Sequence, residues 1–103
     1  MKIGVASEGD NENAQVSMVS GRAPYYLIFD NEKLVEVIKN PFAIGGGGAG
    51  FGVGQMLANK GVEVVVSGRF GPNVSSFLQS KGIKIVEMSN ISVKEAVRGI
   101  LND

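Results

Sequence analysis

The sequence contains neither cysteine nor histidine among its 103 residues. It therefore cannot form disulfides, and it offers no thiolate or imidazole ligand to a metal ion. Its serines have no histidine to activate them, and the sequence patterns G-x-S-x-G and S-x-x-K of serine nucleophiles are missing. We therefore expect a binding or accessory role rather than an enzyme, with no catalytic residue and no metal ligand of its own.

The chain also lacks an excess of charge and a long apolar run. Ten Lys and Arg balance ten Asp and Glu, without a basic cluster that would bind a phosphate backbone. No apolar stretch approaches the roughly 20 residues of a membrane-spanning helix. The first six residues lead directly into a strand pattern, without the charged and apolar regions of a signal peptide. We expect no nucleic-acid or membrane partner and a cytoplasmic location.

What the chain does contain is typical of one folded domain. Hydrophobic residues make up 44% and charged residues 19% of the sequence, which is the balance of an ordinary globular protein. A chain of this length forms one core. We expect a single domain over residues 1–103.

Alternating and helical patterns predict the order β-β-β-α-β-α-β-α. Strands are expected at 2–6, 25–30, 34–39, 62–66 and 83–87, and the second and third form a hairpin around residues 31–33. Helices are expected before Gly61, between Pro72 and Gly82, and after the capping box of Ser92 and Glu95. Right-handed crossovers make the first, fourth and fifth strands parallel. The result is a three-layer α/β sandwich with a mixed sheet.

Seven of the ten residues 45–54 are glycine, and residues 45–50 formally fit G-x-G-x-x-G. This match does not predict a dinucleotide site, because that fingerprint follows the first strand of its unit and precedes an acidic residue after another strand. A phosphate-binding P-loop sequence is also missing. Gly52 and Gly54 each cost a helix up to about 1 kcal/mol relative to alanine, which suggests that some group approaches the backbone there. A mobile loop and a backbone cradle for a ligand remain as alternatives.

Residues 67–72 join a strand end to a helix start, where free N–H groups and the helix dipole favour an anion. Arg69 could add a charge-assisted hydrogen bond, and the alternative is a routine turn with a solvated arginine. Residues 7–24, the glycine run and residues 67–72 should converge at the carboxyl ends of the parallel strands, where open α/β sheets bind ligands. Glu8, Asp10 and Glu12 lack the spacing of a calcium loop, so we expect a solvated acidic loop.

Residues 16–26, with the sequence VSMVSGRAPYY, resemble the motif vs-x-HFGRAPYF of the dinitrogenase iron-molybdenum cofactor biosynthesis domain family. The first strand, the glycine run, the fourth strand with Gly68 and Gly71, and the fifth strand are similar to family landmarks in the same order. Val19 and Ser20 stand where the motif has histidine and phenylalanine. The resemblance covers essentially the whole chain.

The resemblance implies a ribonuclease H-like fold with strand order 3-2-1-4-5, strand two antiparallel and about three helices. It also implies a role in binding an iron-sulfur or iron-molybdenum cofactor precursor. Nuclease activity is not expected, because the first strand carries no carboxylate for metal ions. We expect an anionic cofactor to be held without a bond to metal. The candidate cofactor-binding residues are Ser20, Gly21, Arg22, Gly46, Gly47, Gly48, Gly50, Gly68, Arg69 and Gly71.

The alternative function is a protein-interaction module without a cofactor, whose glycine loop becomes ordered against a partner protein. The third strand is expected at an exposed edge of the sheet, which is compatible with a monomer or a weak homodimer.

Overall fold

A computed structural model describes residues 1–44 and 49–102 of the chain. The elements are β1 (Lys2–Ser7), the 3₁₀ helix η1 (Ser20–Arg22), β2 (Tyr25–Asp30), β3 (Lys33–Lys39), α1 (Ala49–Asn59), β4 (Val64–Ser67), α2 (Pro72–Ser80), β5 (Lys84–Glu87) and α3 (Val93–Leu101). No helix in the described part is long and apolar enough to cross a membrane.

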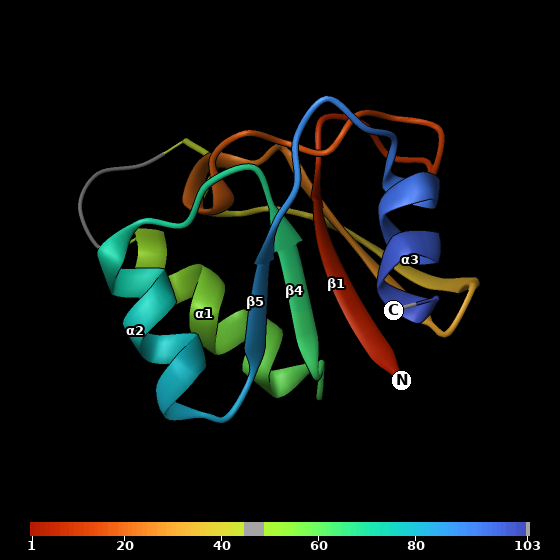
Figure 1. The fold of residues 1–103 in the computed structure, drawn as a ribbon. Coiled ribbons are helices and arrows are strands. Elements are labelled where there is room, and N and C mark those ends of the chain that lie inside the picture. Colours follow the sequence, from red (N-terminus) through yellow and green to blue (C-terminus); the bar gives the residue numbers. More distant parts are fainter. Residues whose placement is uncertain (45–48, 103) are drawn as a thin grey trace.

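The five strands form one mixed sheet in the order β3-β2-β1-β4-β5. Strands β1, β4 and β5 are parallel, while β2 is antiparallel to both of its neighbours. The strand order, the antiparallel second strand and the three α-helices confirm the predicted fold. Because the parallel strands β1, β4 and β5 point the same way, their carboxyl ends meet at one edge of the sheet (Figure 1).

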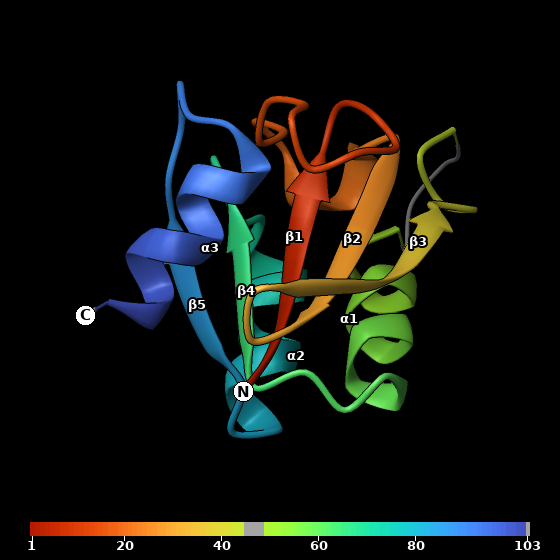
Figure 2. The same cartoon turned by 90° about the vertical axis from the view of Figure 1, so that its right-hand side faces the viewer.

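The helices cover both faces of the sheet. Figure 2 shows α3 on one face, with α1 and α2 behind the sheet on the other. One core cluster joins α1 and α2 to the sheet through residues such as Tyr26, Leu57 and Leu78. The second cluster joins α3 to the sheet through residues such as Phe29 and Val97. Strand β4 is buried along its whole length, as expected for a central strand covered on both faces.

The ends of the elements follow local chemistry. Gly61 and Gly82 adopt φ values of +73° and +75°, so both helix stops predicted from glycine are confirmed. Ser92 accepts a hydrogen bond from the backbone N–H of Glu95, which caps α3. The hairpin turn is one residue shorter than predicted, because Lys33 already pairs with Asp30 in the β2–β3 ladder.

Candidate anion-binding site

The motif residues of η1 lie at the carboxyl edge of the sheet, against the segment that leaves β4 (Figure 1). Val19 forms a parallel bridge with Arg69, and the Ser20 N–H donates to the Arg69 carbonyl oxygen at 3.1 Å. These contacts join two segments that are 50 residues apart in the sequence. They bring two of the three loops expected at this edge into direct contact.

A hollow of about 180 Å³ lies between η1 and the start of α2. The described residues that line it are Val19, Ser20, Gly21, Arg22, Gly71, Pro72, Asn73 and Val74, and none of these is acidic. Four of the residues predicted from the sequence, Ser20, Gly21, Arg22 and Gly71, therefore lie around one small space.

The Ser20 hydroxyl is the least expected feature of this hollow. Ser20 is fully buried, and its Oγ has no hydrogen-bond partner within residues 1–44 and 49–102. A buried hydroxyl without a partner costs a protein on the order of 1–3 kcal/mol. Ser20 also lines the hollow, so this buried hydroxyl lies in the wall of that space.

The first turn of α2 supplies backbone donors to the same space. Gly71 precedes the helix in an extended conformation and provides no side-chain cap. The carbonyl oxygen of Gly71 accepts the first backbone bond of the helix, from the N–H of Ser75. Pro72 has no N–H, so the N–H groups of Asn73 and Val74 are the first-turn donors next to the hollow. With the helix dipole and the Arg22 guanidinium, they give the hollow a positive character.

Tyr26, on β2, holds η1 in place through a hydrogen bond. Its phenolic hydroxyl donates a 2.6 Å hydrogen bond to the Ser20 carbonyl oxygen, and both residues are buried. Desolvation by this burial raises the pKa of Tyr26 far above its ordinary value of 10. The hydroxyl therefore stays protonated and remains a hydrogen-bond donor to η1 at physiological pH.

Asn40 holds the other side of η1, and sequence reasoning missed this residue. Its Nδ2 donates to the carbonyl oxygens of Ala23 at 2.9 Å and Gly21 at 3.3 Å. Its Oδ1 accepts from the Phe42 N–H at 2.9 Å. Asn40 is buried, so these bonds connect the end of the hairpin to the motif with little competition from water. An asparagine before a proline looks like an ordinary loop residue in the sequence.

Gly68 and Arg69 take structural positions near the hollow without lining it. A Cβ atom on Gly68 would lie 2.7 Å from the Met18 Cα. Glycine at this position therefore allows the segment around Met18 to approach the residue that follows β4. The Gly68 N–H donates to the Ser17 carbonyl oxygen at 2.8 Å. The Arg69 side chain is exposed, while its carbonyl oxygen anchors Ser20. A ligand contact for either residue stays a prediction.

Only part of the predicted glycine cradle lies within the described residues. Gly46, Gly47 and Gly48 lie outside the described residues, and Gly50 belongs to the first turn of α1. The helix glycines have a different explanation, because a Cβ on Gly52 or Gly54 would lie 2.4 Å or 2.7 Å from the rings of Phe42 and Phe77 respectively. These two glycines accommodate aromatic side chains rather than a ligand.

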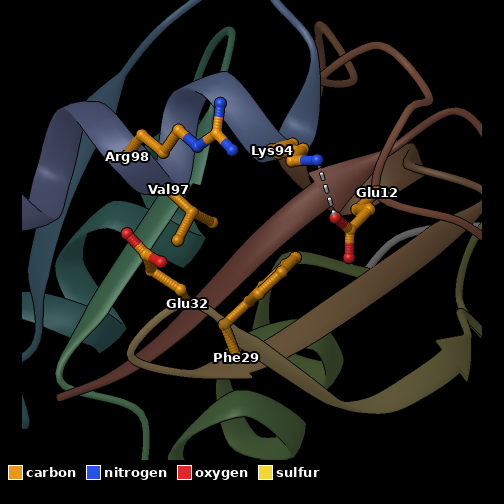
Figure 3. A pocket seen from close by; sticks show the side chains of 6 residues that line it. All are labelled: Glu12, Phe29, Glu32, Lys94, Val97 and Arg98. Carbon is orange, nitrogen blue, oxygen red and sulfur yellow. Dashed lines mark ion pairs between the residues drawn. The ribbon is translucent and has the colours of Figure 1, made fainter.

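A second pocket, shown in Figure 3, lies between α3 and the β2–β3 hairpin. It has a volume of only about 60 Å³, and its lining combines Glu12 and Glu32 with Lys94 and Arg98. Glu12 and Lys94 form an ion pair at 3.7 Å. Two acidic and two basic residues therefore balance the charge of the lining, and the pocket favours no ligand of one sign. Within the described part of the chain, no group of three or more Asp or Glu could hold a metal ion.

Comparison with known proteins identifies the family. The family model described as dinitrogenase iron-molybdenum cofactor matches residues 1–103. The chain belongs to this family. The family resemblance inferred from the Gly21-Arg22-Ala23-Pro24 stretch and the order of the other landmarks is thereby confirmed.

Solved structures agree with this assignment. The apo form of the orange protein from Desulfovibrio gigas superposes with a TM-score of 0.91 at 30% identity, over 98% of this chain and 87% of that protein. A NifB-like protein of the DUF35 family from Thermotoga gives a TM-score of 0.84 at 30% identity, with the same coverages of 98% and 87%. No curated protein matches the sequence significantly.

Proposed function

We propose that this member of the dinitrogenase iron-molybdenum cofactor family is a non-enzymatic accessory protein that binds an anionic cofactor or cluster precursor at the carboxyl edge of its sheet. The observation that carries the proposal is the buried Ser20 hydroxyl, which lacks a partner among the described residues and lines the same hollow as Arg22 and the first turn of α2. An anion in the hollow would accept from all three kinds of donor.

The chemistry of the hollow fits an anion better than a bare metal ion. Its polar side chains are the Ser20 hydroxyl, the Arg22 guanidinium and the Asn73 amide, each of which can donate hydrogen bonds, and the backbone N–H groups of the first turn of α2 add further donors. A cluster precursor with anionic oxygen or sulfur atoms on its surface would be held by these donors while its metals keep their own ligands. Arg22 supplies the compensating charge, and Ser20 supplies a hydroxyl donor in the wall of the hollow.

The hydroxyls near the sheet edge support a non-enzymatic role. Ser7 Oγ donates to the Gly9 carbonyl oxygen at 2.7 Å. Ser67 Oγ lies within hydrogen-bonding distance of two carbonyl oxygens, those of Arg69 at 3.0 Å and Ser17 at 3.3 Å. Backbone carbonyls hold these hydroxyls as structural donors and do not act as bases that would create a nucleophile.

Titration of ¹⁵N-labelled protein with molybdate tests the proposal, and sulfate serves as a tetrahedral dianion of a different element. We expect saturable amide shifts at Gly21, Arg22, Gly71, Asn73 and Val74 with at least one of the two anions. Unchanged positions of these five signals up to tens of millimolar of both anions would overturn the proposal.

Ser20→Ala separates binding from folding. We expect weaker anion binding together with a free energy of unfolding that is unchanged or higher by about 1 kcal/mol, because the substitution removes an unsatisfied hydroxyl. Ser76→Ala, at an exposed serine on the surface of α2, is the matched control and should leave both quantities unchanged. Equal anion affinity in wild type and Ser20→Ala would contradict the assigned role of the hydroxyl.

Exposed apolar side chains near the same edge favour the second candidate function, a protein-interaction module. Met18, Val19 and Phe51 are 49%, 47% and 54% exposed, and Ile44 is 96% exposed. Affinity capture from native lysate after anaerobic growth, with metal analysis of the eluate, distinguishes the two functions. A stoichiometric protein partner that is lost in Phe51→Glu, without bound metal, would favour the interaction module.

A further inference from the structure

A larger hollow of about 420 Å³ opens next to the motif, between the start of β2 and the end of β3. The described residues that line it are Arg22, Pro24, Tyr25, Lys39, Asn40, Pro41, Ala43 and Ile44. Sites for small organic molecules have volumes of about 300–1,000 Å³, so this hollow has room for such a ligand. The 180 Å³ hollow described above is considerably smaller, and Arg22 is the residue that lines both.

The charges of the larger hollow have one sign. Among its described lining residues, the charged ones are the cations Arg22 and Lys39. Lys39 is directly opposite Tyr25 in the antiparallel β2–β3 ladder, so the two side chains project from the same face of the sheet. A cation therefore stands next to an aromatic residue on the rim of the hollow.

The remaining lining residues are mostly apolar, and two of them are prolines. Pro24 and Pro41 contribute rigid rings, and Ala43 and Ile44 add aliphatic surface. An apolar lining of this kind favours the apolar part of an organic ligand over a small hydrated ion.

Hydrogen bonds fix the position of these walls. The Asn40 N–H donates to the Pro24 carbonyl oxygen at 3.0 Å, which joins the two sides of the hollow. The side-chain amide of Asn40 is already bonded to the backbone at Ala23 and Phe42. Asn40 therefore supports the walls, and a ligand does not need to order them first.

We propose that this hollow binds a small organic anion, with its apolar or aromatic body against Pro24, Tyr25 and Pro41 and its acidic group toward Arg22 and Lys39. This site goes beyond the anion site at the start of α2, because its larger volume and apolar walls select for an organic body. The two sites are adjacent, and an occupant of one would lie close to an occupant of the other.

The probe for this site is naphthalene-2-sulfonate, added to ¹⁵N-labelled protein. We expect saturable amide shifts at Tyr25, Lys39, Asn40, Ala43 and Ile44. Neutral 2-naphthalenemethanol should bind at least several-fold more weakly, and inorganic sulfate should not move the Lys39 and Ala43 signals. Absence of saturable shifts with naphthalene-2-sulfonate would overturn the proposal, as would equal affinity for the neutral alcohol.

Substitutions at Lys39 locate the acidic group of the probe. Because Lys39 is exposed at a strand end, its variants should fold normally. We expect Lys39→Gln to weaken binding about threefold and Lys39→Glu to weaken it roughly tenfold. Lys33→Gln and Lys33→Glu change the same charge at the other exposed end of β3 and should leave the affinity unchanged. Equal effects at Lys33 and Lys39 would show non-specific charge attraction and overturn the site.

The outcome is distinguishable from that of the proposed function. Signals of Asn73 and Val74 follow the small hollow, and signals of Lys39 and Ala43 follow the large one. Molybdate shifts without naphthalene-2-sulfonate shifts would uphold the former site and overturn the latter, and the reverse result would do the opposite.

Discussion

The Tyr26 hydroxyl lies 2.6 Å from the Ser20 carbonyl oxygen, in a contact that water does not reach. The bond connects the second strand of the sheet to the short helix that carries the family motif. The position of the candidate site therefore depends on a side chain that does not line it.

Tyr26→Phe should lower the free energy of unfolding by about 1–3 kcal/mol, because a buried carbonyl oxygen loses its donor. Urea denaturation followed by far-UV circular dichroism measures this change. Tyr25→Phe, at a half-buried position on the other face of the strand, is the matched control and should cost less. A loss for Tyr26→Phe no greater than that for Tyr25→Phe would show that the bond does not stabilise η1.

The burial of Tyr26 also predicts a loss of stability in alkali. Its pKa is raised in the folded protein and ordinary in the unfolded chain, so the unfolded state releases the phenolic proton first. The contribution of Tyr26 is fully present below about pH 10 and falls as the pH rises above that value, by up to about 1.4 kcal/mol per pH unit. The free energy of unfolding of Tyr26→Phe should therefore fall less steeply with pH than that of wild type, by up to about 1.4 kcal/mol per pH unit above pH 10. Urea denaturation between pH 9 and 11 measures both slopes. Parallel slopes for the two proteins would contradict the effect.

Gly68→Ala should destabilise the protein by about 1–3 kcal/mol, because the new methyl group would lie 2.7 Å from the Cα atom and 3.0 Å from the carbonyl oxygen of Met18. We also expect altered amide signals for Ser17 and Ser20, whose backbones are hydrogen-bonded to Gly68 and Arg69. Gly99→Ala is the control, because Gly99 is an exposed position inside α3 where the new methyl group meets its nearest atom at 3.6 Å. That variant should be up to about 1 kcal/mol more stable than wild type. If Gly68→Ala also stabilises the protein, the close approach to Met18 is not a constraint.

Asn40→Asp should be more damaging than Asn40→Ala. The aspartate removes the two donors to Gly21 and Ala23 and places a carboxylate against their carbonyl oxygens, in a buried position. We expect Asn40→Ala to lower the free energy of unfolding by about 2–3 kcal/mol. Asn40→Asp should lower it further at pH 7, and this extra loss should shrink as the pH falls and the carboxylate gains a proton. Thermal unfolding at pH 7 and pH 4.5 measures both effects, and an aspartate variant equal to alanine at both pH values would contradict them.

Most of the architecture could be predicted from the sequence because its signals are local. The left-handed stops at Gly61 and Gly82 and the cap at Ser92 are set by a few adjacent residues. The hairpin and the parallel direction of the first, fourth and fifth strands followed from turn signals and the crossover rule, and the family resemblance implied the full strand order. The length of the hairpin turn was missed by one residue, because the pairing of Lys33 with Asp30 depends on the register of the whole ladder.

The candidate site was predictable in part, for a physical reason. Ser20, Gly21, Arg22 and Gly71 follow from the motif and from the position of a helix start, and the structure brings them together. Asn40 and Tyr26 act through tertiary hydrogen bonds whose partners are 17 and 6 residues away, and the sequence contains no local signal for either bond. The inference that some group approaches the backbone at Gly52 and Gly54 is confirmed, but the sequence could not identify that group, because the rings of Phe42 and Phe77 come from other segments.

The first residue of the motif and the segment before it are hydrogen-bonded to the last third of the chain. Val16 donates to the Ile91 carbonyl oxygen, Val93 donates to that of Ala14, and Lys94 donates to that of Glu12. These backbone bonds span more than 70 residues of sequence, so they can form only when the chain between them has been closed into a loop. Although the motif lies in the first quarter of the polypeptide, the segment that leads into it is therefore held by residues around the start of α3. A chain that is truncated before residue 91 would lose these three bonds together with one layer of its fold.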